Sequence, residues 1–187
     1  GQGSRNWEAV KTLMFHSPAT FRSLLDRLAE AVGAHLQAQI DAGAAAVQLF
    51  DTWAGVLSPE DYRRWALPAA RKALSMVDGL TIYFTRDSAP FLDWLHEVGA
   101  EAIGLDWRVD IGEARARLHG GLALQGNLDP LALHAPKEEI QRRVRRIISS
   151  AGRHGHVFNL GHGCIPSTPI DGVQAAVDAV KEWTWSD

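Results

Sequence analysis

Short apolar segments alternate with longer amphipathic segments along the chain. Each short segment is an apolar run of a few residues bounded by turn-forming residues, which is the pattern of a buried strand. Five strands are therefore expected, at 45–50, 80–84, 102–105, 122–125 and 156–159. Strands that are separated by helices pair in parallel, because each return to the sheet needs a crossover connection.

The amphipathic segments predict helices with one apolar face. Ser17-Pro18 opens the first helix, and Gly43 ends it. Its apolar face consists of Phe21, Leu24, Leu25, Leu28, Val32, Leu36 and Ile40. Further helices are expected at 58–77, 91–98, 113–118, 136–150 and after 168. Pro68 should kink the helix over 58–77, because proline has no N–H to donate to the preceding turn.

Two α/β architectures fit this order, a doubly wound sheet and a barrel. No strand is followed by the Gly-x-Gly-x-x-Gly turn of dinucleotide-binding folds. Polar residues instead follow every strand, as they do at the active-site face of a barrel, although polar residues also simply mark the starts of loops. They are Asp51, Thr52, Thr85, Arg86, Asp106, Gln125, Asn127, Asn159 and His162. The recurrence favours the barrel.

The length of the chain limits how much of a barrel it can supply. A complete (β/α)8 barrel takes about 250 residues, and this chain has 187. We therefore expect an α/β fold with about five strand-helix units of a (β/α)8 TIM barrel, in a single domain over 1–187. About three further units would precede Gly1.

Composition and charge exclude several classes of function. The formal net charge of −3 offers no general attraction to nucleic acid or to an anionic membrane. The single cysteine, Cys164, excludes an internal disulfide and a multi-cysteine metal site, and it fits a reducing cytoplasm. No stretch approaches the roughly 20 apolar residues that span a bilayer. We expect a cytoplasmic protein with no nucleic-acid or membrane partner.

The segment with the clearest chemical content is Asn159-Leu160-Gly161-His162-Gly163-Cys164-Ile165-Pro166-Ser167-Thr168-Pro169. It follows the last expected strand, and glycines flank its histidine. Because glycine has no side chain to block a ligand, His162 can meet a substrate there; a histidine hydrogen-bonded within the loop is the alternative. Thr168 is expected to cap the next helix, with Pro169 at its first position.

Other polar residues have a structural and a chemical interpretation. Thr52 could donate its hydroxyl to a substrate oxygen or cap the next turn. Asp106 could be a general base, and a buried carboxylate tied to backbone amides is at least as reasonable. Gln125, Asn127 and Asp129 are expected to hold loops together, with Asp129-Pro130 forming a turn.

Two further signals are weak. The basic run of Arg142, Arg143, Arg145 and Arg146 lies toward the end of a helix, where cations favour the helix dipole, and it is expected to be a solvated face. His162 and Cys164 supply only two potential zinc ligands, whereas closed zinc sites need about four. We therefore expect no metal site.

Four segments in order resemble one known family, uroporphyrinogen decarboxylase. They are Leu49-Phe50-Asp51-Thr52-Trp53-Ala54-Gly55, Gly104-Leu105-Asp106-Trp107, Leu124-Gln125-Gly126-Asn127-Leu128-Asp129-Pro130 and Asn159-Leu160-Gly161-His162-Gly163. The resemblance covers nearly the whole chain and corresponds to the C-terminal half of the family's barrel. Gly1-Gln2-Gly3-Ser4 also resembles a glycine-serine segment of the family.

The resemblance implies a homodimer of haem biosynthesis that needs no metal or organic cofactor. Such enzymes decarboxylate the four acetate side chains of uroporphyrinogen III to give coproporphyrinogen III, using the protonated pyrrole ring as an electron sink. Three positions match substrate-binding residues of the family. Thr52 stands where the family more often has serine, His162 is expected to contact a carboxylate side chain, and Phe50 is expected to line the cleft.

The family's central catalytic residues have no counterpart in this chain. Its essential aspartate, its carboxylate-binding arginines and an active-site tyrosine belong to the N-terminal half. The resemblance therefore implies no catalytic residue here, and we expect the 187-residue chain alone to be inactive.

Two rival functions remain open. A zinc-dependent methylcobamide:thiol methyltransferase shares the barrel, but it needs a His-x-Cys pair after an inner strand, where this chain has Phe84-Thr85-Arg86-Asp87-Ser88. A non-catalytic half-barrel module is the other rival. The sequence upstream of Gly1 would separate this module from the enzyme.

Overall fold

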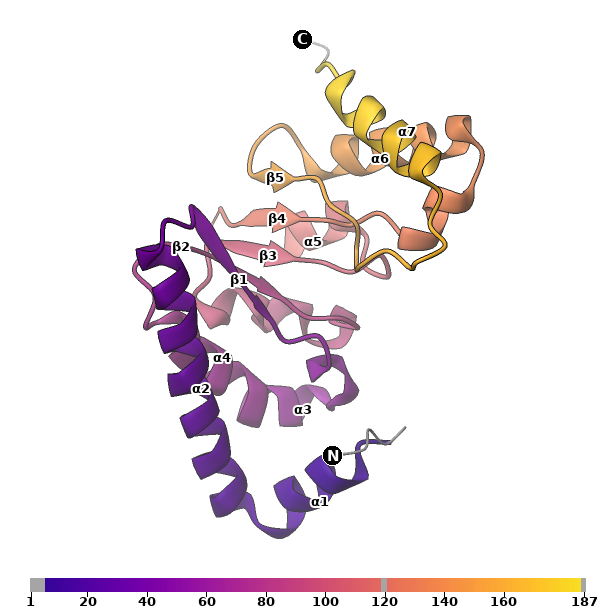
Figure 1. Ribbon diagram of the computed structural model, residues 1–187. Helices are drawn as coiled ribbons and strands as arrows, with labels where there is room; N and C mark the ends of the chain where they lie inside the picture. The colour runs from indigo at the N-terminus through magenta and orange to yellow at the C-terminus, as the bar shows by residue number, and fades with distance from the viewer. Residues whose placement is uncertain (1–5, 119–120, 186–187) are drawn as a thin grey trace.

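The computed structural model describes residues 6–118 and 121–185, so the segment 1–4 lies outside the described residues. Five parallel strands form one sheet: β1 (Ala46–Phe50), β2 (Leu80–Phe84), β3 (Ala102–Gly104), β4 (Ala123–Gln125) and β5 (His156–Val157). They lie side by side in the order of the sequence (Figure 1). A doubly wound sheet reverses its strand order part-way. The unbroken order is that of a (β/α)8 barrel, and all five predicted strands are confirmed.

Helices connect successive strands and cover the outer face of the sheet. The α-helices are α1 (Glu8–His16), α2 (Pro18–Asp41), α3 (Pro59–Asp61), α4 (Leu67–Leu74), α5 (Ile111–Arg117), α6 (Lys137–Ala151) and α7 (Ile170–Lys181). Short 3-10 helices are η1 (Ala54–Val56), η3 (Ala89–Val98) and η4 (Pro130–His134). Each of α2, α4, η3, α5, α6 and α7 packs against the next, which gives an arc of helices around the sheet (Figure 1).

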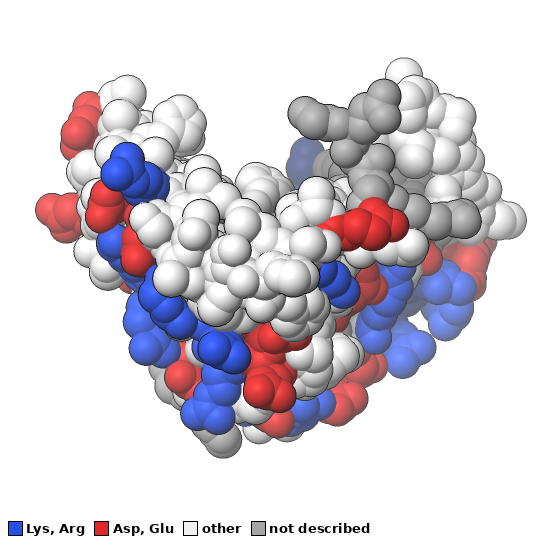
Figure 2. All heavy atoms as spheres, turned by 90° about the horizontal axis from the view of Figure 1, so that it is seen from below, with Lys and Arg blue, Asp and Glu red and all other residues white. Residues whose placement is uncertain are grey.

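The two faces of the sheet differ in what covers them. Val47, Tyr83, Ile103 and Leu124 point toward the helices and are at most 4% exposed, within the main hydrophobic core. On the other face, Phe50 is 67% exposed and Val157 is 49% exposed. Seen from below, the molecule is hollowed on one side, where few charged side chains lie, whereas Lys, Arg, Asp and Glu gather on the opposite side (Figure 2).

One hydrogen bond shows that the sheet is curved. The side-chain amide of Gln125 in β4 donates to the side-chain oxygen of Gln48 in β1, at 3.0 Å. Neighbouring strands lie about 4.8 Å apart, so three strand spacings would separate these residues by roughly 14 Å in a flat sheet. The two side chains therefore meet across a concave face, which is the interior of the partial barrel.

Two parts of the helix prediction need correction. Helix α1 has no counterpart among the predicted helices, because its buried face consists of Met14 alone. The short helix expected over 91–98 is confirmed and is the 3-10 helix η3. Helix α7 begins at Ile170, so Pro169 precedes the first helical residue and the Thr168 hydroxyl is not its cap.

The expected helix over 58–77 is divided by a π-helical turn, η2 (Tyr62–Ala66). The N–H of Leu67 bonds to the carbonyl of Tyr62, five residues back. Pro68 follows directly and has no N–H to continue the α-helical hydrogen bonds. The turn before α4 therefore contains one residue more than an α-helical turn. A π-turn thus precedes Pro68, and the kink expected at this proline stays a prediction.

No helix within the described residues is long and apolar enough to cross a membrane.

Candidate functional site

The loops that follow the five strands meet at the carboxyl edge of the sheet, which we call the rim. It comprises residues 51–53 after β1, 85–88 after β2, 106–108 after β3, 126–129 after β4 and 159–163 after β5. Active sites of (β/α)8 barrels are built from the loops at this edge. Thr52 and His162 both belong to it, and Phe50 is the last residue of β1.

His162 lies against the aromatic ring of Phe84, the last residue of β2. The two rings meet edge to face with their centroids 6.0 Å apart. The backbone N–H of Gly163 donates to Nδ1 of His162 at 2.7 Å. Because Nδ1 accepts this bond, the neutral ring carries its proton on Nε2. The half-buried histidine therefore presents a donor, which suits a carboxylate ligand.

The glycines beside His162 have different roles. A Cβ on Gly161 would lie 2.5 Å from the backbone nitrogen of Trp107, so this glycine lets the last loop pass directly against the loop after β3. A Cβ on Gly163 would meet nothing within 4 Å. Only Gly163 thus borders open space. The expectation that glycine leaves room for a ligand beside His162 therefore fits Gly163, whereas Gly161 serves close packing.

Phe50 and His162 both contact the ring of Phe84. The centroid of Phe50 is 5.9 Å from that of Phe84, again at a steep angle. Phe84 therefore links two of the three residues that the sequence predicts as substrate contacts. Thr52 is half-buried two residues beyond Phe50, and its hydroxyl has no hydrogen-bond partner within residues 6–118 and 121–185.

A buried polar chain, which the sequence did not predict, lies beneath the rim. The hydroxyl of Tyr62 donates to that of Tyr83 at 3.3 Å, and Tyr83 donates to a carboxylate oxygen of Asp51 at 2.9 Å. Both tyrosines are 0% exposed. Burial raises the pKa of Asp51, and the hydrogen bond from Tyr83 opposes that shift. The alternation of side chains along β1 and β2 places residues 51 and 83 on the helix-facing side of the sheet. This alternation is the sequence signal that could have predicted their contact.

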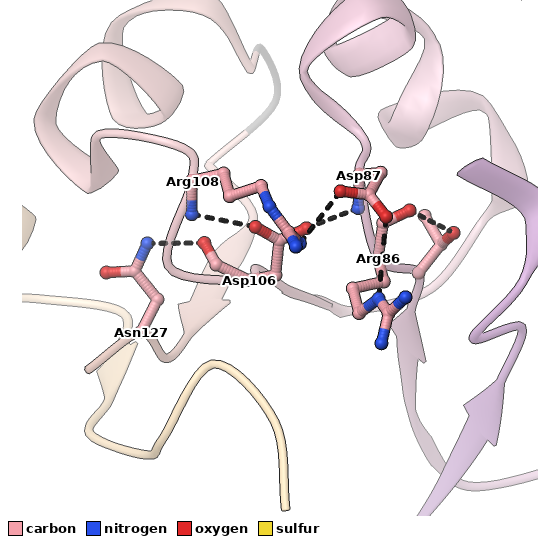
Figure 3. Close-up of polar contacts among 6 residues, drawn as sticks. Arg86, Asp87, Asp106, Arg108 and Asn127 are labelled. Carbon is pink, nitrogen blue, oxygen red and sulfur yellow. Dashed lines mark hydrogen bonds and ion pairs between the residues drawn. The ribbon is translucent and has the colours of Figure 1, made fainter. Parts of the chain in front are cut away.

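Asp106 joins the loops after β2 and β3. It is 0% exposed, and one carboxylate oxygen accepts from the backbone N–H of Arg108 at 2.7 Å while the other accepts from the backbone N–H of Asp87 (Figure 3). Its own carbonyl accepts from the side-chain amide of Asn127 at 2.8 Å. Of the two interpretations open for Asp106, the geometry is that of a carboxylate tied to backbone amides.

Asn127 and Asp129 hold loops together as expected, whereas Gln125 lies in β4 and bonds Gln48 of β1 instead. Asn127 also bonds the carbonyl of Val109 at 2.6 Å, and Asp129 caps η4 through the N–H of Leu131 at 2.9 Å. In the basic run, Arg142 and Arg143 pair with Glu139, and all four arginine side chains are between 48% and 70% exposed. This run is a solvated face of α6.

An apolar cavity of about 320 Å³ lies between α1, α2, α4 and the end of β1. Trp7, Phe21, Leu28 and Trp65 line it, and Phe50 and Trp53 connect it to the rim. The Trp7 ring lies 5.2 Å from the ring of Trp53, so α1 and the loop after β1 meet at this point.

The family model described as uroporphyrinogen decarboxylase (URO-D) matches residues 1–183. The chain belongs to the uroporphyrinogen decarboxylase family. Among curated relatives, a protein of that name from Streptomyces coelicolor is 47% identical over 98% of this chain and 53% of its own length. Another, from Geobacter metallireducens, is 42% identical over 96% of this chain and 54% of its own length.

The fold has a counterpart among solved structures. A methyltransferase from Methanosarcina mazei superposes with a TM-score of 0.86 over 94% of this chain and 53% of its own, at 21% identity. At that identity the likeness concerns the fold. The chain thus spans about half the length of the uroporphyrinogen decarboxylase relatives, and its five strand-helix units form part of a (β/α)8 barrel.

Proposed function

We propose that this chain is the C-terminal portion, over 1–187, of a uroporphyrinogen decarboxylase. The reaction would replace the carboxylates of the four acetate side chains of uroporphyrinogen III with hydrogen, releasing CO2 and giving coproporphyrinogen III. The match of the family model to nearly the whole chain carries this proposal. The position of Thr52, His162 and Phe50 at or beside the rim supports it.

The chemistry that we assign to this chain is substrate binding. The pyrrole ring, once protonated, accepts the electrons of the breaking carbon–carboxylate bond, so the substrate takes the part that an organic cofactor plays in other decarboxylases. His162 would donate Nε2–H to a carboxylate side chain, and Thr52 would donate its hydroxyl. Phe50 would pack against the apolar macrocycle from the exposed concave face.

The acid chemistry would belong to residues outside this chain. Within the described residues, β1 pairs only with β2 and β5 only with β4, so one edge of each end strand is open. Three further strand units would occupy these edges and would bring the family's aspartate and arginines to the rim. The proposal therefore includes that the 187-residue chain alone does not decarboxylate. It also includes the homodimer that the resemblance implies and the cytoplasmic location that the single cysteine favours.

The test compares two proteins, the product of the complete reading frame that contains this sequence and the 187-residue chain alone. Each is incubated anaerobically with uroporphyrinogen III, and the products are oxidised and separated by chromatography. We expect coproporphyrinogen from the complete protein and none from the chain. A complete protein without decarboxylase activity would overturn the proposal, and turnover by the isolated chain would overturn its division of the site. Light scattering on the complete protein checks the dimer.

The rivals make different predictions for the same preparations. A zinc-dependent methyltransferase would contain stoichiometric zinc, whereas residues 6–118 and 121–185 hold no group of three or more His, Cys, Asp or Glu side chains placed to bind a metal. A non-catalytic module would be encoded by a reading frame that begins near Gly1. Zinc analysis and the upstream sequence therefore separate these alternatives.

A further inference from the structure

Two arginines converge at the rim and have no part in the site described so far. Arg86 lies two residues beyond β2, and Arg108 lies four residues beyond β3. Their guanidinium groups approach the same carboxylate, that of Asp87 (Figure 3). Arg108 contacts one oxygen at 2.8 Å, and Nε of Arg86 contacts the other at 3.4 Å.

The backbone that carries these side chains is fixed from below. The buried carboxylate of Asp106 accepts the backbone N–H of Asp87 and that of Arg108, so it holds both loops at one point. Asp87 has a φ of 59°, in the left-handed region that few residues other than glycine adopt. Residues held in this region are concentrated at functional sites.

Each guanidinium also lies over an indole ring. Arg86 is 4.6 Å from the ring centroid of Trp53, and Arg108 is 4.4 Å from that of Trp107. Stacking occupies the flat face of a guanidinium and leaves the N–H groups at its edge free to bond. Trp53 is the residue after Thr52, so Arg86 is tied to the loop that carries a proposed substrate contact.

The cluster has donors left over for a ligand. A guanidinium has five N–H donors, and Asp87 engages Arg86 only through Nε. The two terminal nitrogens of Arg86 point away from Asp87 (Figure 3). Both side chains reach solvent, at 25% exposure for Arg86 and 45% for Arg108. A carboxylate could therefore bind to Arg86 without displacing Asp87.

We propose that Arg86, supported by Arg108 through Asp87, binds a carboxylate side chain of the substrate at the rim. The planar edge of a guanidinium matches the two oxygens of a carboxylate, which is the group that uroporphyrinogen carries around its ring. The inference rests on the proposed function and adds a specificity-determining residue to it. Arg86 contributes binding and orientation, and Arg108 is a positioning residue that keeps Asp87 in place.

The test measures binding of uroporphyrin III, the stable oxidised form of the substrate, to the protein from the complete reading frame by fluorescence titration. The variants are Arg86→Gln, Arg86→Lys and Arg108→Gln. The last of these changes only the side chain, so the backbone N–H of residue 108 still donates to Asp106. Arg145→Gln is the matched control, because Arg145 is 51% exposed on α6 and meets Glu182 only at 4.0 Å. Melting temperature and steady-state turnover of uroporphyrinogen are measured for every protein.

We expect Arg86→Gln to raise the Kd about tenfold, the usual loss for one charge-assisted hydrogen bond. Arg86→Lys should recover only part of this loss, because the charge remains whereas the planar edge and the stack on Trp53 are removed. Arg108→Gln should have an intermediate effect, and Arg145→Gln none. In turnover, Arg86→Gln should raise KM more than it lowers kcat.

Three results would overturn the inference. In the first, the wild type binds and turns over substrate but Arg86→Gln binds as the wild type does, so the proposed function stands and the arginine has no role. In the second, Arg86→Gln and Arg86→Lys lose affinity equally and both melt more than about 5 °C lower, which assigns a purely structural role. In the third, the wild type neither binds nor turns over the tetrapyrrole, and the proposed function fails together with the inference.

Discussion

The ring of Phe84 contacts the rings of both His162 and Phe50, with centroid distances of 6.0 and 5.9 Å. It therefore connects the last rim loop to the end of β1. A Cβ on Gly104 in β3 would lie 3.0 Å from this ring, which leaves Phe84 little room to move. The orientation of two proposed substrate contacts thus depends on a side chain that need not touch the substrate.

Replacing Phe84 with leucine should weaken tetrapyrrole binding without unfolding the protein. The two aromatic contacts that are lost contribute about 0.5–1.5 kcal/mol each, so binding should weaken by at most about 3 kcal/mol. Fluorescence titration with uroporphyrin III measures the effect. Phe158→Leu is the control, because Phe158 makes a similar contact with His156 at 6.3 Å. Equal losses in the two variants would contradict the orienting role of Phe84.

The Tyr62–Tyr83–Asp51 chain predicts a large effect of one hydroxyl group. Tyr83→Phe removes the donor to Asp51 and the acceptor for Tyr62, so two buried polar groups lose their partner. We expect the free energy of unfolding to fall by about 1–3 kcal/mol in urea denaturation. Tyr62→Phe removes only the outer end of the chain and should cost less. A larger loss of stability in Tyr62→Phe than in Tyr83→Phe would contradict the central position of Tyr83.

Asp51 itself should make stability depend on pH in a defined direction. Because burial raises its pKa in the folded protein, the folded state binds a proton more readily than the unfolded state. Its contribution is favourable below the usual value of 3.8 and is lost as pH rises through the folded pKa. Asp51→Asn keeps an acceptor for Tyr83 and removes the charge. Its stability relative to the wild type should rise in urea titrations as the pH is raised above 3.8, and a pH-independent difference would contradict this account.

Arg115 is a structural arginine that joins three segments. Its guanidinium donates to the carbonyls of Ala151, Leu122 and Gly155 at 3.0, 2.8 and 2.7 Å. Arg115→Met should lower the free energy of unfolding by about 2–4 kcal/mol, because three carbonyls, two of them in part-buried bonds, lose a charged donor. Arg117→Met on the same helix removes only exposed ion pairs and should cost at most about 1 kcal/mol. Similar losses in both variants would contradict the distinction.

His156 should titrate below its usual range. Burial lowers its pKa from the ordinary 6.5, and the nearby charge of Arg115 acts in the same direction, against the contact of Nε2 with the carbonyl of Gly126. The folded state therefore binds fewer protons, so this contribution to stability is present above pH 6.5 and is lost as pH falls through the folded pKa. NMR titration of the ring protons, with His156→Gln to assign the signal, measures the shift. A value at or above 6.5 would contradict it.

The sequence predicts the strands well because their apolar runs and flanking turn residues are local signals. Each predicted run lies within two residues of the strand's ends. The π-turn before Pro68 could not be predicted from the sequence. It depends on the hydrogen bond from the N–H of Leu67 to the carbonyl of Tyr62, which amino-acid composition does not specify. Helix α1 escapes prediction for a related reason: one buried methionine gives no periodic apolar face.

For the site, the sequence identifies residue types at the rim but not their connections. Asp106 could be a base or a structural carboxylate by sequence alone. The choice depends on the backbone N–H groups of Asp87 and Arg108, and the first of these comes from a loop 19 residues earlier in the chain. The part of Gly161 in loop packing needed the position of Trp107. The roles of Thr52, Phe50 and His162 in binding substrate stay predictions, because spacing along the chain specifies position and not ligand.

The bond between Gln48 and Gln125 also bears on how a barrel is completed. It joins β1 to β4 across three strand spacings, so the bend of this half is set by contacts within the chain itself. Any segment that adds strands to the open edges then meets a surface whose curvature is already fixed. The conformational entropy of bending the sheet is lost when this half folds. A smaller entropy cost therefore opposes the later association with the strands that complete the barrel.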